Sequence, residues 1–77
     1  MKKTRRTIRL KRGETRSFLC GDSPRSHLHV VIHSHDNLFV TCRKTQEVIR
    51  VECARGTARR HFLVIPKNTR VFVTCRR

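Results

Sequence analysis

The chain contains few acidic residues, few glycines and no long apolar run. Only five of its 77 residues are acidic, and they are scattered at Glu14, Asp22, Asp36, Glu47 and Glu52. The three glycines form no phosphate-binding loop, and no Ser/His/Asp pattern is present. A Cys–His nucleophile pair would need an activated thiol, which an apolar environment does not provide. The sequence therefore predicts that the protein is not an enzyme.

Apolar stretches are far shorter than the ~20 residues of a membrane-spanning helix, so no membrane association is predicted. A secretory signal is not expected either, because Met1-Lys2-Lys3 is followed by the basic segment 4–9 where an apolar run would be required. These features predict a cytoplasmic protein. In a reducing cytoplasm the four cysteines are expected to be thiols rather than disulfides.

Basic residues dominate the composition. The 19 lysines and arginines exceed the five acids by 14, which gives a net charge of +14. Such an excess of positive charge attracts polyanions. Nucleic acid is the first partner class that we expect, followed by acidic proteins and anionic lipid. Residues 1–13 hold seven of the basic residues and no acid. This run is typical of arms that bind nucleic acid, and the alternative is a solubilising tail that guards a sheet edge.

One seven-residue segment occurs twice in the chain, with conservative changes. Leu38-Phe39-Val40-Thr41-Cys42-Arg43-Lys44 returns as Val71-Phe72-Val73-Thr74-Cys75-Arg76-Arg77, a shift of 75 − 42 = 33 residues. The other two cysteines obey the same shift, since 53 − 20 = 33. Residues 14–44 thus align with residues 47–77 without a gap. This predicts a single domain, 1–77, with a basic arm or edge strand at 1–13 and two copies of one structural unit.

Both copies are predicted to consist of β-strands, because β-branched residues dominate short segments that end at turn signals. The expected strands are residues 5–11, 15–20, 27–34, 38–43, 47–53, 60–65 and 70–76. They predict an all-β domain of six or seven strands. In it, two three-stranded units related by a pseudo-twofold pack core face to core face, as a small barrel or sandwich. A homodimer would enlarge the thin core of so short a chain.

Alternation along the strands assigns one apolar face to each copy. This face carries Phe18, Cys20, Leu28, Val30, Ile32, Leu38, Val40 and Cys42, then Ile49, Val51, Cys53, Leu63, Ile65, Val71, Val73 and Cys75. All four cysteines fall on it. Their gaps of 42 − 20 = 22, 53 − 42 = 11 and 75 − 53 = 22 residues lack the close pairs of zinc sites.

We therefore expect the cysteines to be small buried thiols, with disulfides or a metal site as alternatives. No cofactor and no bound metal are predicted. A bridge between Cys42 and Cys53 is not expected, because a hairpin at 44–47 would place them roughly 13 Å out of register.

Four histidines gather in the expected strand 27–34 and the turn after it. His27, His29, His33 and His35 alternate with other residues and point away from the cysteine face. A solvated polar face is the main interpretation. The alternatives are a metal site, for which neutral imidazole is a common ligand, and contact with phosphate or bases.

The outward face of the duplicated strand carries an aromatic ring, a hydroxyl and a guanidinium in steps of two, at Phe39, Thr41 and Arg43 and again at Phe72, Thr74 and Arg76. A base can stack on such a ring while an arginine holds phosphate. Alternatively, the two phenylalanines fill a second small core. The full predicted nucleic-acid-binding set is Lys2, Lys3, Arg5, Arg6, Arg9, Lys11, Arg12, Arg25, Phe39, Arg43, Arg55, Arg59, Arg60, Phe72 and Arg76.

Ile8-Arg9-Leu10 followed by Arg12-Gly13-Glu14-Thr15 resembles the opening turn of the carbon-storage-regulator family of small β-stranded RNA-binding repressors. The resemblance covers residues 8–15 and does not extend to the duplicated second half, the cysteines or the histidines. The predicted function is binding of RNA or single-stranded DNA by a small regulatory or accessory protein. The alternative is a basic module that docks on an acidic protein partner and inhibits it. A third hypothesis is a structural zinc protein.

Overall fold

In the computed structural model, which describes residues 5–43 and 46–77, every regular element is a β-strand. The strands are β1 (Arg5–Leu10), β2 (Thr15–Cys20), β3 (Ser26–Ile32), β4 (Asp36–Cys42), β5 (Glu47–Cys53), β6 (Arg59–Ile65) and β7 (Thr69–Cys75). The all-β prediction is confirmed, and the expected strand bounds differ from the observed ones by at most two residues. Lys2 and Lys3 of the predicted arm lie outside the described residues.

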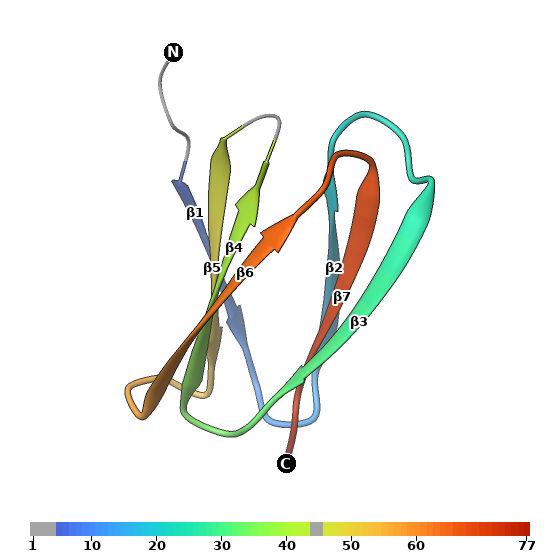
Figure 1. Cartoon of the computed structure of the whole chain (residues 1–77). Coiled ribbons are helices and arrows are strands. Elements are labelled where there is room, and N and C mark those ends of the chain that lie inside the picture. The colour runs from blue at the N-terminus through green and yellow to red at the C-terminus, as the bar shows by residue number, and fades with distance from the viewer. Residues whose placement is uncertain (1–4, 44–45) are drawn as a thin grey trace.

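The strands form two sheets that face each other (Figure 1). One sheet has four strands in the order β1-β5-β4-β6, and the other has three in the order β2-β7-β3. The pairs β4–β5 and β2–β7 are antiparallel, whereas β1–β5, β4–β6 and β3–β7 are parallel. None of the described residues belongs to a helix that is long and apolar enough to cross a membrane.

The strands of the two repeats occupy equivalent places. Adding 33 to the ends of β2, β3 and β4 at residues 20, 32 and 42 gives 53, 65 and 75, the ends of β5, β6 and β7. The registers also correspond, because the pair Ser26↔Thr69 maps onto Arg59↔Asp36 (26 + 33 = 59 and 69 − 33 = 36).

Each repeat was expected to form its own three-stranded unit, and this expectation is wrong. The central strand of each sheet comes from the other repeat: β7 lies between β2 and β3, and β4 lies between β5 and β6. The reason is the short connection over residues 43–46, which makes β4 and β5 neighbours in an antiparallel hairpin. This hairpin brings the last strand of the first repeat into the sheet of the second, and β7 takes the equivalent place beside β2.

The core lies between the two sheets, where the alternation places the apolar side chains. The buried apolar residues are Leu10, Phe18, Cys20, Ile32, Leu38, Val40, Cys42, Ile49, Val51, Cys53, Ile65, Val71, Val73 and Cys75. Three expected core residues, Leu28, Val30 and Leu63, are only partly buried, because they belong to the edge strands β3 and β6. Leu10 and Ile8 contribute β1 to the core, so β1 is part of the fold.

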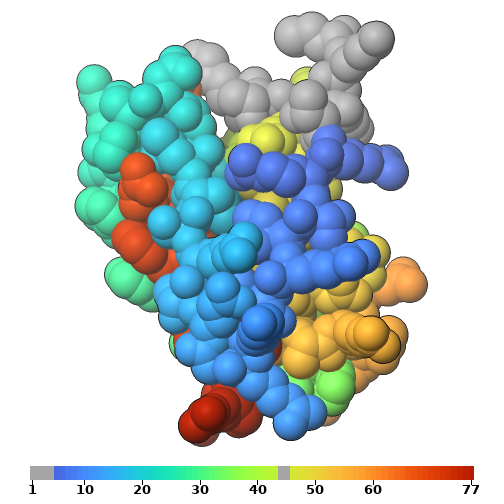
Figure 2. All heavy atoms as spheres, turned by 180° about the vertical axis from the view of Figure 1, so that it is seen from behind, coloured from blue at the N-terminus to red at the C-terminus, as the bar shows by residue number. Residues whose placement is uncertain are grey.

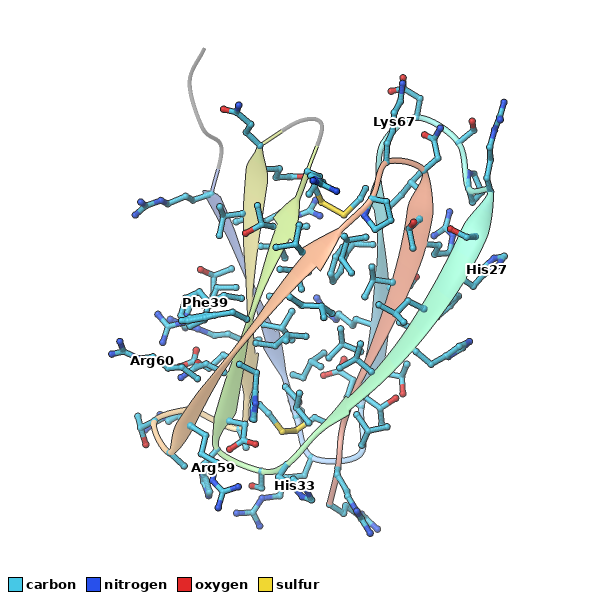
Figure 3. The ribbon with its side chains drawn as sticks, in the orientation of Figure 1. His27, His33, Phe39, Arg59, Arg60 and Lys67 are labelled. Carbon is cyan, nitrogen blue, oxygen red and sulfur yellow. A yellow bond between two sulfur atoms is a disulfide. The ribbon has the colours of Figure 1, made fainter. Side chains whose placement is uncertain are left out.

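All four cysteines form disulfides, so the expected thiols are a wrong prediction. Cys20 pairs with Cys42 and Cys53 with Cys75, each with a Cα–Cα distance of 5.4 Å and a sequence separation of 22 residues. Each bond ties one sheet to the other, near opposite ends of the molecule (Figure 3). The alternation of side chains correctly predicted that the cysteines point toward the core. It does not predict which inward-pointing residues of the two sheets contact each other. Cys42 lies opposite Glu47, in agreement with the expected absence of a Cys42–Cys53 bond.

Candidate functional site

Outward side chains of the four-stranded sheet form a surface that we call the arginine face. Its members are Arg5, Thr7 and Arg9 of β1, Val48, Arg50 and Glu52 of β5, Asn37, Phe39 and Thr41 of β4, and Arg60, Phe62 and Val64 of β6. They point outward because their strand neighbours, such as Leu38, Val40, Ile49 and Val51, are buried in the core. Phe39 and Arg60 extend from this side of the sheet in Figure 3.

An aromatic pair lies at the centre of the arginine face. The strand register places Arg50, Phe39 and Phe62 side by side in one row across three strands. The ring centroids of Phe39 and Phe62 are 5.2 Å apart with an angle of 35° between the rings. Phe62 is 66% exposed. Since a buried location would be expected for such a ring, this exposed aromatic surface is open to a ligand.

Arg50 is held over the ring of Phe39 by several contacts. Its Cζ lies 5.8 Å from the centroid of the Phe39 ring, within the range of a cation–π interaction. Its Nε and Nη2 donate to Oδ1 of Asn37 at 3.4 and 3.3 Å, and Nη2 lies 3.7 Å from Oε1 of Glu52. Asn37 is itself buried, and its Nδ2 donates to the carbonyl of Gly56 at 2.6 Å. The guanidinium is therefore oriented before any ligand arrives.

Two hollows flank the pair Phe39–Arg50. One, of about 430 Å³, is lined by Arg5, Arg6, Thr7, Phe39, Val48 and Arg50. The other, of about 370 Å³, is lined by Asn37, Phe39, Arg50, Gly56, Thr57 and Arg60. Each hollow thus combines an aromatic wall with arginines at its margin, the combination that binds a base and its phosphate in single-stranded nucleic acid.

The opposite outer face, on the sheet β2-β7-β3, has a different character. His29 stacks on Phe72 with ring centroids 4.7 Å apart and an angle of 9°, and His27 lies 6.0 Å from the same ring. Beside them the hydroxyls of Thr15 and Thr74 are hydrogen-bonded at 2.8 Å. Phe72 is therefore covered by imidazoles, whereas the equivalent Phe39 is flanked by an arginine and a second phenylalanine.

The four histidines were expected to lie on one face of one strand, and this prediction is wrong. His27 and His29 lie on β3, but that strand ends at Ile32, so His33 and His35 belong to the turn before β4. His35 has a positive φ of 71°, and its Nδ1 bonds the carbonyl of Ala54 at 2.8 Å. Among the described residues no group of three or more His, Cys, Asp or Glu side chains gathers in a way that could hold a metal ion.

The predicted binding residues are divided among several surfaces. Arg5, Arg9, Phe39 and Arg60 come together on the arginine face, with Arg6 in the adjoining hollow. Arg43 and Arg76 directly follow β4 and β7, which end at the top and bottom of Figure 1, so they lie at opposite ends of the molecule. Phe72 lies on the opposite sheet. The remaining residues lie in turns, loops or at the start of β6: Lys11, Arg12, Arg25, Arg55 and Arg59.

One of these turns is anchored to the neighbouring one. Arg12 donates from Nε to Oγ of Ser34 at 3.0 Å, and its Nη2 lies 3.2 Å from Nε2 of His35. Because arginine can only donate, His35 accepts at Nε2 and carries its proton on Nδ1, which faces the carbonyl of Ala54. Arg12 thus has a structural role between the β1–β2 and β3–β4 turns.

Two carboxyl groups have pKa values below their ordinary range. Asp36 is buried, and its Oδ2 lies 3.0 Å from Nε2 of His61. This hydrogen bond lowers the pKa of Asp36, with further contributions from the backbone amide of His33 and the charge of Arg59. The pKa of Glu14 is lowered mainly by the backbone N–H of Lys11, which donates to Oε1 at 2.9 Å. The carboxylate of Glu14 therefore holds the β1–β2 turn, whereas that of Asp36 links β4 to β6.

Sequence reasoning missed Arg50, Phe62 and Asn37 as members of the site. Alternation in β5 and β6 would have placed Arg50 and Phe62 outward, since their neighbours Ile49 and Leu63 point inward. Their position beside Phe39, however, depends on which strands pair. Comparisons with protein-family models, with curated proteins and with solved structures found no match to this chain.

Proposed function

We propose that the protein binds single-stranded nucleic acid, RNA or DNA, on the arginine face, as a small regulatory or accessory factor. The observation that carries this proposal is the row Arg50, Phe39 and Phe62, in which an oriented guanidinium lies beside Phe39 and the exposed ring of Phe62 lies on the other side of Phe39. Stacking of one base on such a ring is worth about 1–3 kcal/mol. Arg5 and Arg60 lie around this row and would supply positive charge for phosphates, as would the exposed Arg9, whose Nε lies 3.2 Å from Oε2 of Glu52.

The architecture supports a rigid binding surface. In this proposal the two facing sheets form one small sandwich of residues 1–77, in which repeats 14–44 and 47–77 are related by a pseudo-twofold. The arginine face then lies on a sheet tied to its partner sheet by both disulfides. Sites on strands hold their side chains more precisely than sites on loops.

The disulfides also bear on where the protein works. Disulfides persist in oxidising compartments and are rare in the cytosol, where thiols are kept reduced. Two disulfides that involve every cysteine of the chain therefore favour an oxidising compartment over the cytoplasmic location expected from the sequence.

The experiment that tests the proposal compares polyanions with and without bases. Fluorescence anisotropy would measure the affinity of the intact protein for a single-stranded RNA dodecamer, its DNA equivalent, the duplexes and a polyphosphate chain of matched charge. We expect the single strands to bind at least about tenfold more tightly than polyphosphate, because bases add stacking energy. All affinities should fall steeply as salt rises, through release of counterions.

A variant separates stacking from charge. Phe62→Ala should reduce binding of the single strands by about tenfold and leave binding of polyphosphate unchanged. Because Phe62 is mostly exposed, the variant should keep the stability of the parent protein. Equal affinity of the parent for single strands and polyphosphate would overturn the proposal, since the face would then recognise charge alone. A parent protein that binds no nucleic acid at low salt would favour the acidic protein partner instead.

A further inference from the structure

Hollows lie between the edge strands on both open sides of the two sheets, and they differ in polarity: arginines line much of the one between β1 and β2, whereas the one between β3 and β6 is mainly apolar. On the back of the molecule, side chains of β1 and β2 lie next to each other across the two sheets (Figure 2). On the other side the edge strands β3 and β6 flank an apolar groove of about 270 Å³. Leu28, Val30 and Leu63 line its walls, and Leu38 contributes from the core. Leu28, Val30 and Leu63 are the expected core residues that remain only partly buried.

Exposed apolar side chains concentrate at the same place. Among the described residues, the large apolar side chains with high exposure are Phe62, Val64 and Val31, at 66, 61 and 60%. All three belong to β6 or β3, and Phe62 and Val31 contribute to the groove. Within residues 5–43 and 46–77, β6 pairs with β4 alone, so its other edge presents backbone N–H and C=O groups without a strand partner.

Free edges are usually protected against further pairing by charged residues or proline. Strand β1, the other edge of the same sheet, carries Arg5, Arg6 and Arg9 over its six residues. In β6 the charges are limited to Arg59 and Arg60 at its start, and the remainder is His61-Phe62-Leu63-Val64-Ile65. The edge of β6 is therefore open to an added strand along most of its length.

We propose that the edge of β6 binds an extended acidic segment of a partner protein, which adds to the sheet as a fifth strand. Alternate side chains of the added strand enter the groove beside Leu63 and against Leu28 and Val30, while the others lie beside Phe62 and Val64 on the outer face. Acidic residues at one end of the segment face Arg59 and Arg60, which project into solvent at the start of β6 (Figure 3).

Charge complementarity selects this occupant over a second copy of the chain. Two copies would bring together net charges of +14 each, which oppose association. An acidic segment instead gains from the arginines at the start of β6 and from the net charge of the whole protein. Arg59 is not needed by the arginine face, so this inference can be tested separately from nucleic-acid binding.

The test uses a capped synthetic peptide, Glu-Asp-Val-Thr-Val-Ile-Val-Thr, and the intact oxidised protein. Isothermal titration would measure affinity, and hydrogen–deuterium exchange would report which amides the peptide protects. We expect amide exchange across 59–65 to slow by about tenfold with saturating peptide, while amides of β1 are unaffected. The same peptide with Lys-Lys in place of Glu-Asp should bind at least about tenfold more weakly, because it meets like charges.

Two variants of equal charge locate the site. Arg59→Glu should weaken binding of the acidic peptide by about tenfold, whereas Arg25→Glu, in the loop between β2 and β3, should weaken it by about twofold at most. Protection confined to β3, equal affinity for the acidic and basic peptides, or equal effects of the two variants would overturn the proposal. So would slow exchange of 59–65 without peptide together with a dimer in sedimentation, because a second copy would then cover the edge.

Discussion

Phe39 and Phe72 occupy equivalent positions in the two repeats, 72 − 39 = 33 residues apart, and lie on opposite outer faces of the molecule. Each sits between two buried valines or leucines of the central strand of its sheet. Their neighbours differ, however, because Phe39 meets Phe62 and Arg50 whereas Phe72 is stacked by His29 and His27. Equivalent positions of the two repeats therefore lie on two chemically distinct surfaces.

This pair supplies a matched test of the binding face. Phe39→Ala should reduce affinity for single-stranded nucleic acid by about tenfold, because it removes a ring from the arginine face. Phe72→Ala should destabilise the fold about as much as Phe39→Ala does, but it should leave the affinity for single-stranded nucleic acid unchanged. Anisotropy titrations and thermal melts of both variants would check this. Equal losses of affinity in the two variants would contradict the assignment to the arginine face.

Asn37 links stability to the orientation of Arg50. Asn37→Ala should cost about 1–3 kcal/mol of stability, since it leaves the buried carbonyl of Gly56 without its donor. It should also weaken nucleic-acid binding, because Arg50 is no longer held. Arg50→Lys keeps the charge but loses the planar fork, so it should weaken binding with little loss of stability. Urea unfolding and titrations would separate the two effects, and unchanged binding by both variants would show that the orientation of Arg50 is irrelevant.

Disulfide pairing can be read directly by mass spectrometry. Digestion under non-reducing conditions should yield peptides that join Cys20 to Cys42 and Cys53 to Cys75. Both bonds span 22 residues, so replacing either pair by alanine should cost about 3 kcal/mol. A linked peptide that joins Cys20 to Cys53, or free thiols in protein taken from its natural source, would contradict the pairing or the proposed oxidising compartment.

Asp36 should make the fold sensitive to acid. Its pKa in the folded protein lies below the ordinary value of about 3.9, because His61 donates to the carboxylate. The resulting stabilisation is complete above pH ~4 and is lost as pH falls through the lower folded pKa, when the carboxylate must be protonated. Asp36→Asn should therefore show a smaller decrease of melting temperature between about pH 5 and 2 than the parent. Parallel curves for the two proteins would exclude this contribution.

Gly56 packs where no side chain fits. A Cβ at this position would lie 2.5 Å from the carbonyl oxygen of Asp36 and 2.7 Å from Oδ1 of Asn37. Gly56→Ala must therefore shift the 54–58 loop and should cost about 1–3 kcal/mol. Thr57→Ala, at the exposed neighbouring position, is the control and should change stability by less than about 0.5 kcal/mol. Equal melting temperatures for the two variants would mean that the loop relaxes freely.

The sequence by itself determined much of the local structure. β-branched residues and turn signals placed the strands to within two residues, and alternation directed Val40, Ile49 and Val73 inward and Phe39 outward. The 33-residue shift matched the strands of one half to those of the other. These features are local, since each depends only on neighbouring residues and on the period of two in an extended chain.

Tertiary structure alone decided which strands became neighbours. The pairing of β4 with both β5 and β6 brought Arg50 and Phe62 to Phe39, although the three residues belong to different strands. The packing of the two sheets against each other likewise brought Cys20 next to Cys42. Alternation predicts that both side chains point toward the core, but it does not predict the distance between them. Such contacts depend on loop lengths and on the joint packing of all strands, which no single stretch of sequence contains.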